Sequence, residues 1–165
     1  MRKILLFILS LTLYVSAGIT IGDQAKDFKL KTLDNKQSHT LKSFRGEVVL
    51  VNLWASWCKG CKKEMPEFVG LQKSYKKGFK LITVNLDDDP KKAQAFLQKV
   101  EKKTGSKIPF VALKNPSKSV AKAYQCGAMP SSYLIDKQGK IRNIIVGSLN
   151  KDEIEQLKQE INKLK

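Results

Sequence analysis

Apolar residues along this chain follow two spacings, and each spacing predicts a different element. Residues 48–54 (VVLVNLW) are almost continuously apolar, as expected of a β-strand covered on both faces. Residues 80–86 and 110–113 form shorter runs that also predict strands. Elsewhere apolar positions recur every three or four residues, which predicts amphipathic helices. The residues at this spacing are Ala93, Phe96, Leu97 and Val100 in one segment and Ile154, Leu157, Ile161 and Leu164 in another.

Turn residues divide the rest of the chain into hairpins and shorter helices. The two predicted hairpins are residues 28–41, which turn at Asp34-Asn35, and residues 132–147, which turn at Lys137-Gln138-Gly139. Two further helices are predicted over residues 58–75, with Pro66 inside, and over residues 119–125. The resulting order, ββ–β–α–β–α–β–α–β–β–α, predicts an α/β domain whose mixed sheet has helices on both faces.

The first 17 residues have the pattern of an export signal. Arg2 and Lys3 precede an apolar run over residues 4–15, and Ala17 suits a cleavage site. We therefore expect a signal peptide over residues 1–17 and one domain over residues 18–165. An uncleaved membrane anchor is the alternative, although residues 4–21 are short for a span. Either reading predicts an exported protein, located in the periplasm or on the outer face of the cytoplasmic membrane, where conditions are oxidising.

The formal net charge is +16, and it remains +14 without Arg2 and Lys3 because 29 basic residues then face 15 acidic ones. Nearly all of the positive charge comes from lysines spread along every segment. A nucleic-acid-binding protein usually clusters arginines and aromatic residues among its lysines, so we expect no nucleic-acid partner. A solvated basic surface is favoured, which leaves a weak attraction to acidic partners or anionic lipid open.

Two cysteines, Cys58 and Cys61, lie just after the most apolar run and carry the main chemical signal. A structural zinc site normally needs four ligands, and the chain adds only Cys126 and His39. A disulfide across so short a loop restrains the unfolded chain little. At the start of a helix, by contrast, free N–H groups favour a thiolate at Cys58, and Cys61 lies one turn further along. The pair is therefore predicted to be a reactive dithiol, and we expect no metal or other cofactor.

Residues 48–68 (VVLVNLWASWCKGCKKEMPEF) resemble the active-site segment of the thioredoxin superfamily, and more narrowly of the exported TlpA/ResA/DsbE-type oxidoreductases. The resemblance extends from GDQAKDFKL at residue 22 to GAMPSSYLIDKQGKI at residue 127. It implies a thioredoxin-like fold with a central mixed sheet flanked by helices and an additional N-terminal β-hairpin. It also implies a thiol–disulfide oxidoreductase that reduces selected protein disulfides, with apocytochrome c thiols as one substrate. A membrane dithiol partner of the DsbD/CcdA type would supply the electrons, and we expect a monomer.

The same resemblance assigns roles to individual residues. Cys58 would attack the substrate disulfide and Cys61 would resolve the mixed disulfide. Trp57 would flank the exposed sulfur, and a partly buried position in the core is compatible with that role. Met129 and Pro130 match the segment whose cis-proline lies against the dithiol and pairs with substrate. Glu64 matches an active-site glutamate that would exchange a proton with Cys61, the alternative being a solvated helix residue.

The chain also departs from the pattern of the family that it resembles. Asn52 stands where thioredoxins carry a buried aspartate, and Gly60 stands where many members have proline. The motif therefore leaves the direction of electron flow open, so a disulfide oxidase or isomerase remains an alternative. A thiol peroxidase is a second one, although Ala55 replaces the threonine or serine expected three residues before its reactive cysteine. A copper metallochaperone is a third, with Cys126 as an additional soft ligand near Met129.

Cys126 and the acidic run Asp87–Asp89 are explained by structural roles. A buried core position is favoured for Cys126, because free cysteines are among the most buried residues. The Asp87–Asp89 run lacks the spaced ligands of a calcium loop. Helix capping explains the run better, since Asp89 can cap a helix whose first residue is Pro90.

Overall fold

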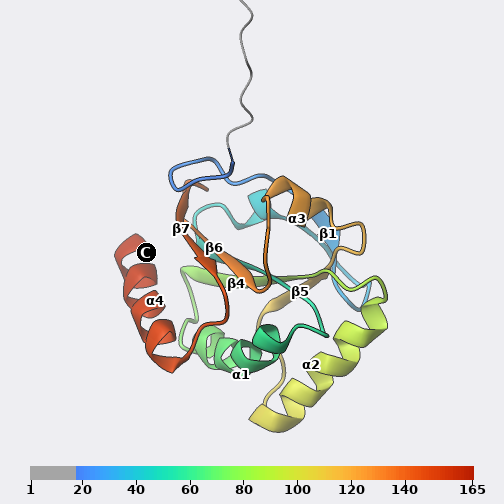
Figure 1. Cartoon of the computed structure of the whole chain (residues 1–165). Helices are drawn as coiled ribbons and strands as arrows, with labels where there is room; N and C mark the ends of the chain where they lie inside the picture. Colours follow the sequence, from blue (N-terminus) through green and yellow to red (C-terminus); the bar gives the residue numbers. More distant parts are fainter. Residues whose placement is uncertain (1–17) are drawn as a thin grey trace, which may run out of the picture.

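The computed structural model describes residues 18–165, which form a five-stranded mixed sheet with helices on both faces (Figure 1). The expected signal peptide, residues 1–17, lies outside the described residues. Within residues 18–165, no helix combines the length and the apolar character that crossing a membrane requires.

The sheet has the strand order β5-β4-β3-β6-β7. Strands β3 (Val48–Trp54), β4 (Phe79–Asn85) and β5 (Val111–Lys114) are parallel to one another. Strands β6 (Ser131–Ile135) and β7 (Ile141–Val146) are antiparallel additions on the other side of β3. The most apolar segment of the sequence is thus the central strand, as its hydrophobic pattern predicts.

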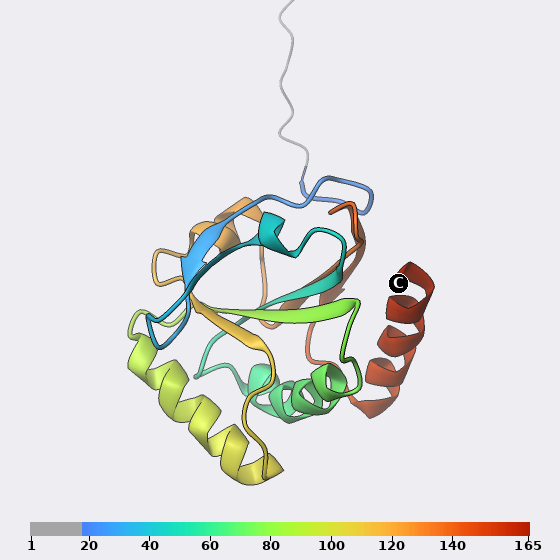
Figure 2. The ribbon, with the colours of Figure 1, turned by 180° about the vertical axis from the view of Figure 1, so that it is seen from behind.

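Three long helices cover one face of the sheet, and smaller elements cover the other (Figure 2). The long helices are α1 (Lys59–Lys73), α2 (Pro90–Thr104) and α4 (Lys151–Leu164). The opposite face carries the helix α3 (Ser119–Ala123), the 3₁₀ turn η1 (Leu41–Phe44) and the predicted N-terminal hairpin of β1 (Lys29–Lys31) and β2 (Ser38–Thr40). The sequence expectation of helices on both faces is confirmed.

Alternating side chains of β3 supply the two halves of the core. Leu50 and Trp54 pack beneath the long helices, whereas Val51 and Leu53 pack beneath the hairpin and α3. All of them are fully buried. Burying a side chain of this size contributes roughly 1.5–3 kcal/mol, so the central strand is anchored from both faces. A firmly held β3 gives the segment that follows it a fixed starting point.

The N-terminal hairpin closes the open edge of β5. Thr32 forms an antiparallel bridge with Leu113, and the Leu33 N–H donates to the Ala112 carbonyl at 3.0 Å. Covering an edge strand in this way removes a template for pairing with other chains.

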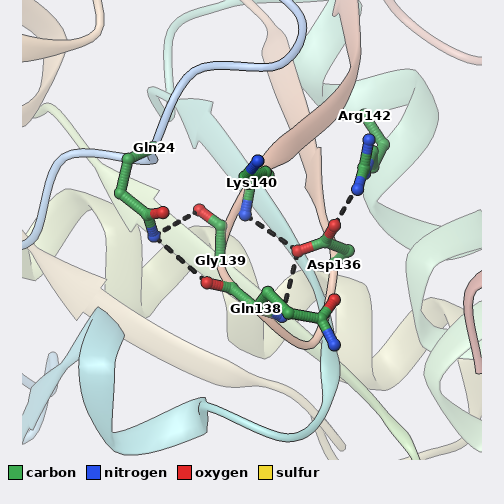
Figure 3. A network of polar contacts seen from close by, with 6 residues as sticks. All are labelled: Gln24, Asp136, Gln138, Gly139, Lys140 and Arg142. Atoms are coloured by element: carbon green, nitrogen blue, oxygen red, sulfur yellow. Dashed lines mark hydrogen bonds and ion pairs between the residues drawn. The ribbon is translucent and has the colours of Figure 1, made fainter.

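The turn between β6 and β7 is tied together by the buried carboxylate of Asp136 (Figure 3). Asp136 accepts hydrogen bonds from the backbone N–H groups of Gln138 and Lys140, and the Arg142 Nε–H donates to it at 2.6 Å. Burial opposes ionisation, yet the Lys140 N–H and the Arg142 guanidinium hold the pKa of Asp136 below its ordinary value. The Gln24 side chain joins the first described segment to this turn by donating to the Gln138 and Gly139 carbonyls.

Candidate active site

The Cys58–Cys61 pair lies where the central strand passes into the first helix. Strand β3 ends at Trp54 and α1 begins at Lys59, so Cys58 is the N-cap residue of α1. This is the position that the sequence predicts for a reactive thiol. A continuous buried strand and a helix packed beneath the sheet therefore fix the dithiol from both sides.

The two cysteines form a disulfide with a Cα–Cα distance of 5.3 Å. The Cys61 N–H points at the Cys58 Sγ from 3.1 Å. Such a donor, together with the positive end of the helix dipole, favours the thiolate form of an N-cap cysteine. Cys58 retains 6% of its surface exposed, while Cys61 is completely buried. Cys58 is therefore the sulfur that a partner can reach.

Trp57 is 65% exposed and stands directly before Cys58. The expectation that Trp57 is also partly buried in the core is therefore wrong. An exposed indole offers a large apolar contact surface that also carries an N–H donor. Such a side chain suits contact with a protein partner beside the reactive sulfur.

The Met129–Pro130 peptide bond is cis, as the resemblance leads us to expect. Pro130 is buried and Met129 is half-buried. A Cβ atom on Gly60 would lie 3.1 Å from Pro130 Cδ and 3.4 Å from the Cβ of Ser148. Glycine at this place in the dithiol motif thus allows the motif and the proline segment to approach closely.

Glu64 is completely buried one turn after Cys61. Its Oε1 accepts a hydrogen bond from Asn52 Nδ2 at 3.0 Å, and its Oε2 accepts one from the Leu149 N–H at 3.2 Å. Burial raises the pKa of Glu64 to about 7, against the opposing effect of these two donors. The alternative of a solvated helix residue is therefore wrong.

Asn52 links Glu64 to the strand beside it. Its Nδ2 also donates to Ser132 Oγ at 3.0 Å, while its buried Oδ1 has no hydrogen-bond partner among residues 18–165. The residue that replaces the aspartate of thioredoxins thus supports a carboxyl group supplied by α1. In this way the buried acid of the site is carried by a different element.

Asp87 is a site residue that the sequence reasoning misses. It is 2% exposed, and both of its carboxylate oxygens accept from the Ser56 N–H at 3.1 Å. Helix capping is the correct explanation for Asp89, whose side chain accepts from the Lys91 N–H, but it is wrong for Asp87. The available signal was an acidic residue two positions after the end of β4, the parallel neighbour of the strand that leads to Cys58.

Cys126 is half-buried and packs against the half of the core that lies beneath the N-terminal hairpin and α3. The expectation of a buried core position is therefore wrong. Its thiol donates to the Ala128 carbonyl at 3.1 Å. His39 is half-buried on the N-terminal hairpin, where its ring contacts Phe44 and its Nε2 lies 3.2 Å from Gln37 Oε1. Across the described part of the chain, no three His, Cys, Asp or Glu side chains are placed to hold a metal ion.

Comparisons with known proteins find similar sequences and similar structures. Residues 21–144 match the model of the AhpC/TSA family. The chain is 33% identical over 159 residues to the thiol-disulfide oxidoreductase ResA of Geobacillus thermodenitrificans, covering 93% of this chain and 87% of the relative. It is 36% identical over 142 residues to the thioredoxin-like protein YneN of Bacillus subtilis, covering 84% and 79% of the two chains. A crystal structure described as a thiol:disulfide interchange protein DsbE of Chlorobium tepidum superimposes with a TM-score of 0.78 at 32% identity, covering 89% of this chain and 99% of that one.

Proposed function

Since this chain belongs to the AhpC/TSA family and is a thiol–disulfide oxidoreductase of the ResA type, we propose that it reduces selected protein disulfides outside the cytoplasm. The observation that carries this proposal is the asymmetric dithiol. Cys58 is reachable at a helix N-cap, Cys61 is buried behind it, and a buried carboxyl group with a pKa of about 7 lies one turn further along α1.

The reaction begins with the reduced enzyme. The Cys58 thiolate attacks one sulfur of the substrate disulfide, and the other substrate sulfur leaves as a thiolate that takes up a proton. Cys61 then gives its proton to Glu64 and attacks the Cys58 sulfur of the mixed disulfide. The second substrate thiol is released, and two electrons have passed from the enzyme dithiol to the substrate. The enzyme is left with the Cys58–Cys61 disulfide.

Glu64 suits the proton step because of its place and its pKa. On a helix, residues three apart are neighbours, which sets Glu64 beside Cys61. A carboxyl group whose pKa is about 7 is partly ionised near neutral pH, so it can accept a proton and return it.

Three further residues form the surface that meets the substrate. The exposed indole of Trp57 contacts the substrate beside the scissile disulfide, and the backbone of Met129 and Pro130 pairs with an extended substrate segment. The close packing of Pro130 against Gly60 supports this assignment, because it brings the proline segment to the dithiol. Protein thiols, with apocytochrome c as one example, are the substrates that we propose.

Each turnover oxidises the enzyme dithiol, so the proposal requires a source of two electrons. A membrane dithiol protein of the DsbD/CcdA type would serve, with the enzyme exported through its N-terminal signal. Export also explains why a reductase is needed, since exposed protein thiols are reoxidised in an oxidising compartment.

The reduction potential of the Cys58–Cys61 pair tests the direction. The protein is equilibrated with dithiothreitol or glutathione buffers, and the fraction of disulfide is determined by thiol trapping. We expect a value near that of thioredoxin, about −270 mV, or lower. A value between about −180 and about −120 mV is typical of isomerases and oxidases. Such a value would show that the protein forms or shuffles disulfides instead.

A further inference from the structure

The turn that carries the dithiol is held by a carboxylate from the neighbouring strand. Within the turn, the Cys58 N–H donates to the Ala55 carbonyl at 3.2 Å. The Ser56 N–H, two residues before Cys58, donates to the two carboxylate oxygens of Asp87, each at 3.1 Å. The contact joins residues 31 positions apart and ties the segment after β4 to the segment between β3 and α1.

The Asp87 carboxylate is itself fixed from behind. Asn85 Nδ2 donates to Asp87 Oδ2 at 2.9 Å, while Asn85 Oδ1 accepts the Asp87 N–H at 3.1 Å. The Asn115 N–H in turn donates to the Asn85 carbonyl at 2.8 Å, which connects the group to the end of β5. The carboxylate therefore has one position, set by the ends of two parallel strands.

Holding this carboxylate is costly. Asp87 is 2% exposed, and among residues 18–165 no lysine, arginine or histidine lies within ion-pair distance of it. A buried carboxylate without a cation must be compensated by hydrogen bonds, and here amide groups provide them. Asp88, the adjacent carboxylate, pairs with Lys118 at the surface instead.

We propose that Asp87 is a positioning residue for the dithiol, acting through Ser56. Its carboxylate fixes the turn after β3, and the fixed turn keeps Cys58 at the N-cap of α1 with its sulfur facing the Cys61 N–H. The inference rests on the proposed role of Cys58 as the attacking thiol. When the turn loosens, the Cys58 sulfur loses part of that donor and of the helix dipole, so its thiolate becomes less stable.

Positioning and simple charge predict opposite outcomes for Asp87→Asn. Removing a nearby negative charge without moving the turn would favour the Cys58 thiolate, lower the pKa of the thiol and speed its reaction. Loosening the turn would raise that pKa and slow the reaction. The sign of the change therefore separates the two effects.

The experiment compares reduced Asp87→Asn with reduced wild-type protein by iodoacetamide alkylation across a pH series, with the modified cysteine identified by mass spectrometry. Asp88→Asn is the matched control. It removes the same charge at the next residue, where the Asp88 side chain is 86% exposed. We expect Cys58 alkylation at neutral pH to fall by roughly threefold to tenfold in Asp87→Asn and to stay unchanged in Asp88→Asn. Unchanged or faster alkylation in Asp87→Asn would overturn the inference.

Amide hydrogen exchange in the wild-type protein gives a second test that needs no variant. The Ser56 amide should exchange slowly in both redox states, as a donor held by a buried carboxylate should. Rapid exchange at Ser56, comparable with that of an unbonded loop amide, would contradict the proposal even if Asp87→Asn failed to fold. If Cys61 is the cysteine that reacts in wild-type protein, the proposed roles fail and this inference fails with them. Unaltered Cys58 reactivity in Asp87→Asn overturns the positioning role alone.

Discussion

At the scale of single residues, Glu64 combines two opposing influences. Two N–H donors stabilise its carboxylate, whereas complete burial favours the neutral acid. Burial prevails, so the pKa of Glu64 rises from 4.5 to about 7. A group balanced in this way changes its protonation state near neutral pH, which is the property that a proton exchanger beside Cys61 needs.

The raised pKa makes stability depend on pH in a defined direction. The folded protein keeps the Glu64 proton up to about pH 7, while the unfolded chain releases it near pH 4.5. Raising the pH through this window therefore favours the unfolded state. We expect the free energy of unfolding of the wild-type protein to fall by about 3 kcal/mol relative to Glu64→Gln across the window. Urea unfolding at a series of pH values measures this difference.

The matched control is Glu67→Gln, which neutralises a half-buried glutamate on the same helix. Its stability should keep the pH dependence of the wild-type protein in this window. Parallel stability curves for wild-type protein and Glu64→Gln between pH 4.5 and 7 would contradict a raised pKa at Glu64.

At the scale of elements, the hydrophobic pattern predicts much of the fold because each signal is local. The continuous apolar run becomes the central strand, and the capping signals at Asp89 and Pro90 begin α2 where predicted. The dithiol is likewise predictable from four adjacent residues. The burial of Glu64 and the Asp87–Ser56 contact are not, because residues far apart in the sequence meet there only in the folded topology.

The start of α4 offers a prediction at this scale. Asn150 and Glu153 form a capping box, with the Asn150 side chain accepting the Glu153 N–H and the Glu153 side chain accepting the Asn150 N–H. The preceding residue, Leu149, donates its N–H to Glu64. Asn150→Ala should cost about 1 kcal/mol of stability. It should also raise the pKa of Glu64 further, because a donor to the charged form is weakened.

Asp89→Ala is the control for this prediction. It removes the N-cap side chain of α2, which is exposed like Asn150 and accepts a hydrogen bond from the Lys91 N–H. We expect a similar loss of stability with an unchanged Glu64 titration, followed by NMR of the carboxyl carbon. Equal Glu64 titration curves for the two variants would show that the α4 cap does not influence the pKa of Glu64.

At the scale of the whole molecule, the positive charge includes lysines beside the dithiol, while Glu64 and Asp87 are buried. The described residues carry a formal net charge of +14, from 29 basic and 15 acidic side chains. Lys59, Lys62 and Lys63 are exposed next to the dithiol, whereas Glu64 and Asp87 are buried. We therefore expect a disulfide that approaches Cys58 to meet a positive potential, which raises the encounter rate of anionic reactants.

This charge predicts how salt affects the reduced enzyme. The rate constant for reducing the dianionic disulfide dithiobis(nitrobenzoate) should fall severalfold between about 10 mM and about 1 M salt, where the Debye length shrinks from about 30 Å to about 3 Å. The rate constant for dicationic cystamine should rise over the same range, and that for neutral dithiodipyridine should stay nearly constant. Stopped-flow measurements compare only the salt slopes, so the different intrinsic reactivities of the three disulfides cancel. Three equal slopes would mean that the lysines are too dispersed to steer reactants, and that substrate selection depends on contacts at Trp57 and Pro130 alone.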